Sequence, residues 1–276
     1  MKSNSPKLLI DYLRSLEAVR FGLMPRDKLA IVVNRVLHLS FPLNVLWYEA
    51  FGRSLIDPRI LVRGYRCQYR NATFHCPGGN QDIQFLKQYE PNVKQIVSTI
   101  VDGDAVDVGS NMGLYTVMLS RCSTRDRRIL SIEADPEYFR WLRKNIESNH
   151  CLNVTALNIA AWSTTTILKL ARHRFGGPPM DSSVASGGYD ISGVRSRPLD
   201  DIFRELEIKP RFIKIDVEGA ELEVMNGAQK TIRSEKPTLI FESLSDTIFG
   251  ECSSMLSQLG YTITPLRGAN FLATFK

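Results

Sequence analysis

Acidic residues and glycines stand at several points of the chain where a short apolar run ends, and these residues could do chemistry. The first run is 105–108, which is apolar except for Asp107 and is followed by Gly109-Ser-Asn-Met-Gly113. Such a run, followed by a glycine turn and an apolar helical face, is typical of a buried strand that leads into a helix. In an open parallel sheet this turn lies at the carboxyl edge, where ligands bind. We expect glycine at 109 because a side chain there would keep a ligand from the backbone.

The spacing of the two glycines indicates the kind of ligand. A dinucleotide turn reads G-x-G-x-x-G, and its second glycine lets a pyrophosphate touch the backbone. Asn111 occupies that place here. Asp107 would repel a phosphate but would attract an ammonium group. The turn therefore favours a cationic nucleoside without phosphate, of which S-adenosylmethionine is the common one, although two glycines can also serve a purely structural turn.

A second predicted strand, 128–133, ends in Glu133. A carboxylate at this position accepts hydrogen bonds from ribose hydroxyls; the alternative is a solvated strand end. Asp135 is expected to cap the following helix, with Pro136 as its first residue. Beyond a third strand, 153–158, Ala161 is placed where an adenine ring would lie. The predicted cofactor-binding residues are therefore Asp107, Gly109, Asn111, Gly113, Glu133 and Ala161.

Further acids follow two later predicted strands. The strand 211–216 ends in Asp216 and continues into Val217-Glu218-Gly219-Ala220-Glu221, and the strand 237–242 ends in Glu242. Acids this close together should raise the pKa of at least one of them, which suits a general base near neutral pH. We predict Asp216, Glu218 and Glu242 as catalytic residues. Two alternatives stay open: the acids could complement the start of a helix, with Asp216 as its cap, or bind a divalent cation, although no metal ligands are assigned.

A long irregular stretch between two predicted antiparallel strands, 165–171 and 193–197, carries Arg172 and Arg174. Loops of this length in compact domains are commonly functional lids. We predict that the two arginines bind an anionic methyl acceptor; a solvated lid without such a role is the alternative.

The elements that position these residues predict an α/β protein with a doubly wound, mostly parallel, seven-stranded sheet. It is expected over 78–276, closed by antiparallel strands at 261–264 and 270–274. Residues 1–77 are expected to form an extension of helices, including ones over 26–39 and 42–51, and a hairpin with strands at 60–63 and 72–76 joined by a basic, aromatic turn. Residues 29–51 are apolar enough for peripheral membrane contact, but polar residues interrupt them too often for a spanning helix.

The composition is that of an ordinary globular protein: 276 residues, 43% hydrophobic and 23% charged, with a formal net charge of +6. This charge weakly favours acidic partners and permits nucleic acid, although no RNA-binding module is recognised. The five cysteines form no C-x-x-C pair and no leader sequence is recognised, so reduced thiols and a cytoplasmic location are expected. Oligomeric state is not predictable from these features.

Together, Asp107-Val-Gly-Ser-Asn-Met-Gly113, Ile132-Glu133-Ala-Asp-Pro136, Arg197-Pro-Leu-Asp-Asp201 and Phe212-Ile-Lys-Ile-Asp-Val-Glu-Gly-Ala-Glu221 resemble the FkbM family of S-adenosylmethionine-dependent methyltransferases. The resemblance covers roughly residues 80–245. It implies a class I methyltransferase fold and methyl transfer to a hydroxyl of a sugar, polyketide or other small molecule. An RNA ribose 2'-O-methyltransferase and a non-catalytic cofactor-binding scaffold are the alternatives.

Overall fold

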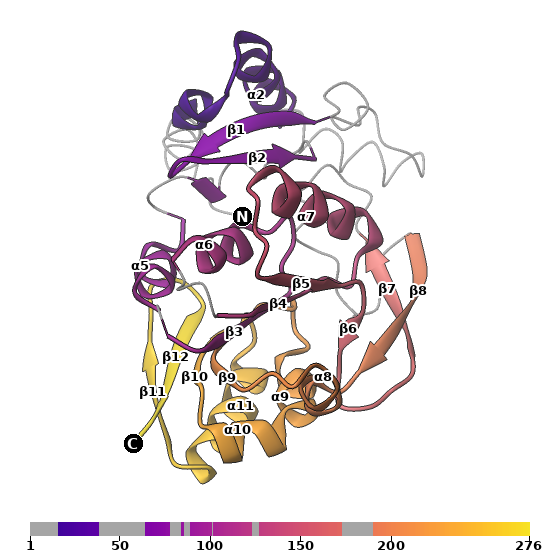
Figure 1. The fold of residues 1–276 in the computed structure, drawn as a ribbon, viewed down its shortest axis with the longest axis vertical. Helices are drawn as coiled ribbons and strands as arrows, with labels where there is room; N and C mark the ends of the chain where they lie inside the picture. The colour runs from indigo at the N-terminus through magenta and orange to yellow at the C-terminus, as the bar shows by residue number, and fades with distance from the viewer. Residues whose placement is uncertain are drawn as a thin grey trace, which may run out of the picture. The chain divides into compact units, whose positions relative to one another are not determined.

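The computed structural model describes residues 16–38, 64–77, 84–85, 89–100, 102–122, 127–172 and 190–276 (Figure 1). The chain divides into two compact units. The first comprises Met1–Tyr89 with His173–Met180, and the second, here called the sheet unit, comprises Glu90–Arg172 with Asp181–Lys276. The helix expected over 42–51 and the strand expected over 60–63 lie outside the described residues.

The first unit contains a helix and a hairpin. A short 3-10 helix, η1 (Leu16–Phe21), precedes α2 (Pro25–His38), which confirms the helix expected over 26–39. Strand β1 (Tyr65–Tyr69) pairs antiparallel with β2 (Ala72–Cys76). Tyr65–Tyr69, which were expected to lie in the turn of the hairpin, therefore form a strand, and that prediction was wrong. Arg70 and Asn71 alone connect the two strands. Both have positive φ (47° and 62°), because a two-residue turn with this backbone matches the twist of the paired strands.

The sheet unit is built on seven strands, as predicted. Their order is β11-β12-β10-β9-β3-β4-β5, and the five strands β3, β4, β5, β9 and β10 run parallel. Strand β12 is antiparallel to both of its neighbours. The strands are β3 (Asp104–Val108), β4 (Ile129–Ile132), β5 (Val154–Leu157), β9 (Pro210–Ile215), β10 (Thr238–Glu242), β11 (Tyr261–Pro265) and β12 (Asn270–Phe275).

Helices cover both faces of this sheet (Figure 1). One face carries α5 (Pro91–Thr99), α6 (Leu114–Cys122) and α7 (Pro136–Ser148), and the other carries α8 (Leu199–Leu206), α9 (Glu221–Gly227), α10 (Gln229–Glu235) and α11 (Asp246–Gln258). Asp135 caps α7 through a bond from the Glu137 N–H, as expected. A large apolar core lies between the sheet and α8–α11, and Val106 and Ile213 belong to it. Successive strand residues point to opposite faces, so the residues between them face α5–α7.

Two local expectations differ from the structure. The single helix expected after residue 217 is split into α9 and α10 at Ala228, whose backbone is not helical. At that point a Cβ on Gly227 would lie 2.1 Å from the carbonyl oxygen of Trp162, so the chain passes too close for a side chain. A separate small sheet contains β6 (Ala160–Ala161), β7 (Ile167–Arg172) and β8 (Asp190–Arg197), of which β7 and β8 form the predicted antiparallel pair. Within the described part of the chain, no helix is both long and apolar enough to cross a membrane.

Candidate active site

The turn after β3 has the left-handed backbone that its glycines suggest. Gly109 and Gly113 have φ of 77° and 91°, and Asn111 between them has φ of 51°. A Cβ at Gly109 would lie only 1.7 Å from the carbonyl oxygen of Asp216. The backbone that follows β9 therefore requires glycine at 109, a reason separate from the expected approach of a ligand. The same approach brings the Asp216 N–H within 3.0 Å of the Val108 carbonyl oxygen.

Glu133 lies directly beside this turn. Its Oε2 accepts the Asn111 N–H at 2.7 Å, and its Oε1 accepts the Asp135 N–H at 2.8 Å. Burial raises the pKa of Glu133 to about 7, although the two N–H donors partly offset that effect. Each carboxylate oxygen has a second lone pair, so both can accept another hydrogen bond. This arrangement fits two neighbouring hydroxyls such as those of a ribose. Asn158, which sequence reasoning missed, supports the site by donating to the Glu133 carbonyl oxygen at 2.8 Å.

Asp107 is almost fully buried, with 1% of its surface exposed. Its Oδ2 accepts the Thr116 hydroxyl at 2.6 Å, and that hydroxyl lies 2.8 Å from the Ser131 hydroxyl. Among the described residues, Asp107 Oδ1 has no hydrogen-bond partner. Burial raises the pKa of Asp107 above its ordinary value. The structure thus places Asp107 beneath the turn, held by Thr116 and Ser131, two polar residues that sequence reasoning did not single out.

Asp216 and Glu242 follow adjacent strands and lie together. One carboxylate oxygen from each of Asp216, Glu218 and Glu242 lies within 4.8 Å of the other two, so the structure brings together the three predicted catalytic acids. Burial and the Asp216 carboxylate raise the pKa of Glu242 to about 9. A divalent cation could contact three oxygens at this spacing. An ammonium group already occupies one side of the cluster, because Lys214 Nζ lies 2.7 Å from Asp216 Oδ2.

Lys214 is the functional candidate that sequence reasoning missed. It stands in the otherwise apolar run of β9 and is only 2% exposed. Its register partner on β3 is Asp107, whose partner on β4 is Ser131, so the three form a polar row on the α5–α7 face. A lysine inside an apolar strand was the available signal, because a buried ammonium needs a partner.

The remaining acid of this stretch, Glu221, has a structural position. It begins α9, is 1% exposed, and accepts the Gly219 N–H at 3.0 Å. Burial raises the pKa of Glu221. The N-cap residue of α9 is Ala220, without a side-chain hydrogen bond, so the alternative in which Asp216 caps this helix is wrong.

Ala161, Arg172 and Arg174 are the remaining predicted site residues. Ala161 is buried in β6, where it pairs with Arg197 of β8, and the Trp162 N–H donates to the Arg197 carbonyl oxygen at 3.1 Å. The Arg172 backbone ends β7, whereas the Arg172 side chain and all of Arg174 lie outside the described residues.

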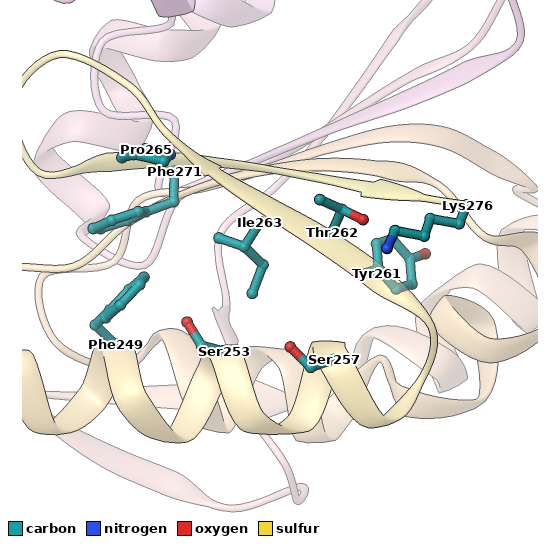
Figure 2. Close-up of a pocket in the computed structure, with 9 residues that line it drawn as sticks. All are labelled: Phe249, Ser253, Ser257, Tyr261, Thr262, Ile263, Pro265, Phe271 and Lys276. Atoms are coloured by element: carbon teal, nitrogen blue, oxygen red, sulfur yellow. The ribbon is translucent and has the colours of Figure 1, made fainter.

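A pocket of about 620 Å³ lies elsewhere on the sheet unit, between α11 and the β11–β12 pair (Figure 2). Figure 2 shows Phe249, Ser253 and Ser257 pointing from the helix toward the strands. Its lining contains no acid and none of the predicted site residues. The candidate active site is therefore the edge formed by the Gly109–Gly113 turn and the ends of β4, β9 and β10.

The seven-stranded sheet, its closing antiparallel strands and the glycine turn after β3 define a class I methyltransferase fold. A family model described as the methyltransferase FkbM domain matches residues 107–263. This chain belongs to that family, and membership implies S-adenosylmethionine as the cofactor. The remaining lone pairs of the Glu133 carboxylate suit the ribose hydroxyls of that cofactor.

Several solved structures are similar to the chain at low identity. An FkbM methyltransferase from Methylobacillus flagellatus KT is 23% identical, with 71% of this chain and 52% of that chain covered and a TM-score of 0.47. An O-methyltransferase from Bacillus cereus in complex with SAH is 14% identical, with 67% and 81% covered and a TM-score of 0.44. The chain thus spans about half the length of the Methylobacillus protein, 52%. No curated protein matches the chain.

Proposed function

We propose that this protein transfers a methyl group from S-adenosylmethionine to a hydroxyl oxygen of a small-molecule acceptor such as a sugar or a polyketide. The observation that carries this proposal is the position of the Asp216 and Glu242 carboxyl groups. Asp216 follows β9, which pairs with β3, and Glu242 ends β10, which pairs with β9; the Asp216 backbone also contacts the turn after β3. A proton acceptor next to the methyl donor is the arrangement that hydroxyl methylation requires, because a neutral hydroxyl is a poor nucleophile.

The cofactor would be held at the edge formed by β3 and β4. Glu133 accepts hydrogen bonds from the ribose hydroxyls, and the Gly109–Gly113 turn lies beside the methionine part. Thr116 and Ser131 keep the Asp107 carboxylate in place beneath this turn. When bound, S-adenosylmethionine supplies a methyl carbon attached to a positively charged sulfur, a good leaving group.

The acids at β9 and β10 would manage the proton of the acceptor. The acceptor oxygen forms a bond to the methyl carbon while the carbon–sulfur bond breaks and its electron pair stays on sulfur. The hydroxyl proton passes to a carboxylate of the cluster, so that charge is balanced. Holding the acceptor in line accounts for much of the rate enhancement expected of such a site.

A labelled-methyl transfer assay tests the proposal. Radiolabelled S-adenosylmethionine is incubated with the full chain and with cell extract separated into small-molecule, lipid and RNA fractions. We expect label in the small-molecule fraction, in a product whose methyl group survives alkaline treatment as an ether does. Label only in RNA, with binding that weakens steeply with salt, would support the ribose methyltransferase instead. Label only in lipid would support a membrane-associated enzyme.

Cofactor binding separates these outcomes from a non-catalytic role. Calorimetric titration with S-adenosylmethionine should give saturable binding to the wild-type chain. Binding without transfer to any fraction would favour a cofactor-binding scaffold, and absence of binding would remove the enzyme proposal altogether.

A further inference from the structure

The Lys214 ammonium contacts Asp216 and the Tyr115 ring inside the sheet unit, and hydrogen bonds extend from Tyr115 to two further residues. Its Nζ lies 2.7 Å from Asp216 Oδ2 and 4.7 Å from the centre of the Tyr115 ring on α6. The Tyr115 hydroxyl donates to Glu90, which immediately precedes α5. Glu90 in turn accepts the side-chain amide of Asn270 at 2.9 Å, from the start of β12. The ammonium therefore has a fixed position beneath the acid cluster.

This contact is one-sided with respect to the acids. Lys214 Nζ makes a charge-assisted hydrogen bond with Asp216 Oδ2, and among the described residues it makes none with Glu242, which has a carboxylate oxygen within 4.8 Å of one from Asp216. Two half-buried carboxyl groups this close together do not both ionise readily. An ammonium fixed against one of them decides which of the two keeps the proton.

We propose that Lys214 is a positioning residue that keeps Asp216 as the carboxylate and Glu242 as the carboxylic acid of the pair. This inference rests on the proposed function and assigns the proton acceptor within it: Asp216 accepts the acceptor's hydroxyl proton, and Glu242 donates a hydrogen bond to Asp216. Lys214 touches neither substrate nor cofactor in this role. It acts through the orientation and charge of Asp216.

The directions of the pKa shifts agree with this geometry. Burial by itself would raise the pKa of Asp216, but the Lys214 ammonium outweighs it and lowers the pKa below the ordinary value. Burial by itself would lower the pKa of Lys214, but nearby carboxylates, chiefly that of Asp216, raise it above the ordinary value. The charged or titratable groups that influence this ammonium are Asp216, Glu90, Asp107, Glu242 and Tyr115.

Carbon-13 NMR of the full chain tests the proposal without an acceptor. The Asp216 carboxyl resonance, assigned with Asp216→Asn, is followed from about pH 5 to 9 in wild type and in Lys214→Gln. We expect no protonation step in wild type and a clear one in Lys214→Gln, because the replacement removes the positive charge but keeps a hydrogen-bond donor. Lys144→Gln is the control. Lys144 also lies over an aromatic ring, with its Nζ 5.2 Å from the centre of the Trp141 ring, but its side chain is exposed.

An Asp216 resonance that titrates in this range in wild type, or one that does not titrate in folded Lys214→Gln, would overturn the proposal. Circular dichroism establishes whether the variant is folded. If Lys214→Gln does not fold, wild type provides the test instead. We expect a scalar coupling, through the hydrogen bond, between the Lys214 ammonium nitrogen and the Asp216 carboxyl carbon. Absence of that coupling would also count against the proposal.

The transfer assay adds the functional readout. Lys214→Gln should lower kcat at least roughly 30-fold near pH 7, leave KM for S-adenosylmethionine within about threefold, and shift the acidic limb of the kcat profile to higher pH. A purely structural lysine would lower stability without moving that limb, and this result would refute the positioning role. If wild type transfers methyl to no fraction, the proposed function fails, while the NMR titration still decides the role of Lys214.

Discussion

Gly109 and Asp216 are joined by the closest backbone approach of the candidate site: a Cβ on Gly109 would lie 1.7 Å from the Asp216 carbonyl oxygen. The turn that begins the cofactor site and the strand that carries the central acid are thereby fixed to one another. A substitution that displaces the backbone at either point should disturb both cofactor binding and the acid cluster.

The first prediction follows from this contact. Gly109→Ala should lower the free energy of unfolding by more than about 3 kcal/mol, because it combines a clash against the backbone with a positive φ that side chains disfavour. Chemical denaturation followed by circular dichroism measures the change. The control is Gly250→Ala, in α11, where a new Cβ meets nothing within 4 Å and should stabilise the helix by about 0.5–1 kcal/mol. Equal stabilities for wild type and Gly109→Ala would contradict the prediction.

Glu133 is predicted to bind the ribose. Glu133→Ala should weaken S-adenosylmethionine binding at least about tenfold in calorimetric titrations, because two charge-assisted hydrogen bonds are lost. The variant also frees the Asn111 and Asp135 N–H groups, so its fold must be checked by circular dichroism. Glu147→Ala, an exposed acid on α7, should bind as wild type does. Unchanged affinity in folded Glu133→Ala would remove the ribose assignment.

Asp216 is predicted to act in the chemical step. Asp216→Asn should keep S-adenosylmethionine affinity within about threefold but lower turnover by roughly 100-fold or more, as expected for loss of a general base. Single-turnover transfer of labelled methyl measures the chemical step directly. Asp201→Asn, on α8 on the other face of the sheet, is the matched control and should transfer methyl normally. Retained turnover in Asp216→Asn would exclude it from the catalytic residues.

The raised pKa of Glu133 predicts a pH dependence of stability. Its pKa in the folded chain, about 7, lies above the ordinary value of 4.5, so the folded state binds more protons between these values. The unfolding free energy should therefore fall as pH rises from about 4.5 to 7, by up to about 3 kcal/mol from this group alone. Urea titrations at several pH values test this, and Glu133→Gln should show a smaller decline. A decline of the same size in that variant would mean that another group is responsible.

The same carboxyl group should govern cofactor binding. Ionised Glu133 can accept hydrogen bonds from both ribose hydroxyls, whereas the protonated form has lost part of that capacity. S-adenosylmethionine should therefore bind more tightly as pH rises from about 6 to 8. Calorimetry at matched ionic strength measures it, and affinity that is flat across this range would contradict the assignment.

Arg172, at the end of β7, and Arg174 give the last prediction. If Arg172 and Arg174 bind an anionic acceptor, Arg172→Gln/Arg174→Gln should raise KM for the acceptor about tenfold or more and leave kcat nearly unchanged. Arg143→Gln, an exposed arginine on α7, controls for the loss of surface charge. An unchanged KM would favour a loop without a binding role.

Much of the sheet unit could be predicted because local patterns are sufficient for it. Short apolar runs separated by helical periodicities give the order of strands and helices, and topological preferences of α/β chains then give a parallel sheet. Because the carboxyl ends of parallel strands share one edge, the positions of Asp216 and Glu242 followed from where their strands end. The hairpin of the first unit was predicted with the right second strand, Ala72–Cys76, but its first strand, Tyr65–Tyr69, was missed because its basic and aromatic residues were assigned to the turn.

The sequence by itself determined which residues stand at the edge of the sheet; the tertiary structure alone decided what they touch. Asp107 and Lys214 are far apart in the chain, and only the register of β3 against β9 makes them neighbours. That register depends on packing across the whole sheet, which no local pattern encodes. The same reason explains why Gly109 is required by the Asp216 backbone, and why a lysine in an apolar strand lies under the acids instead of in solvent.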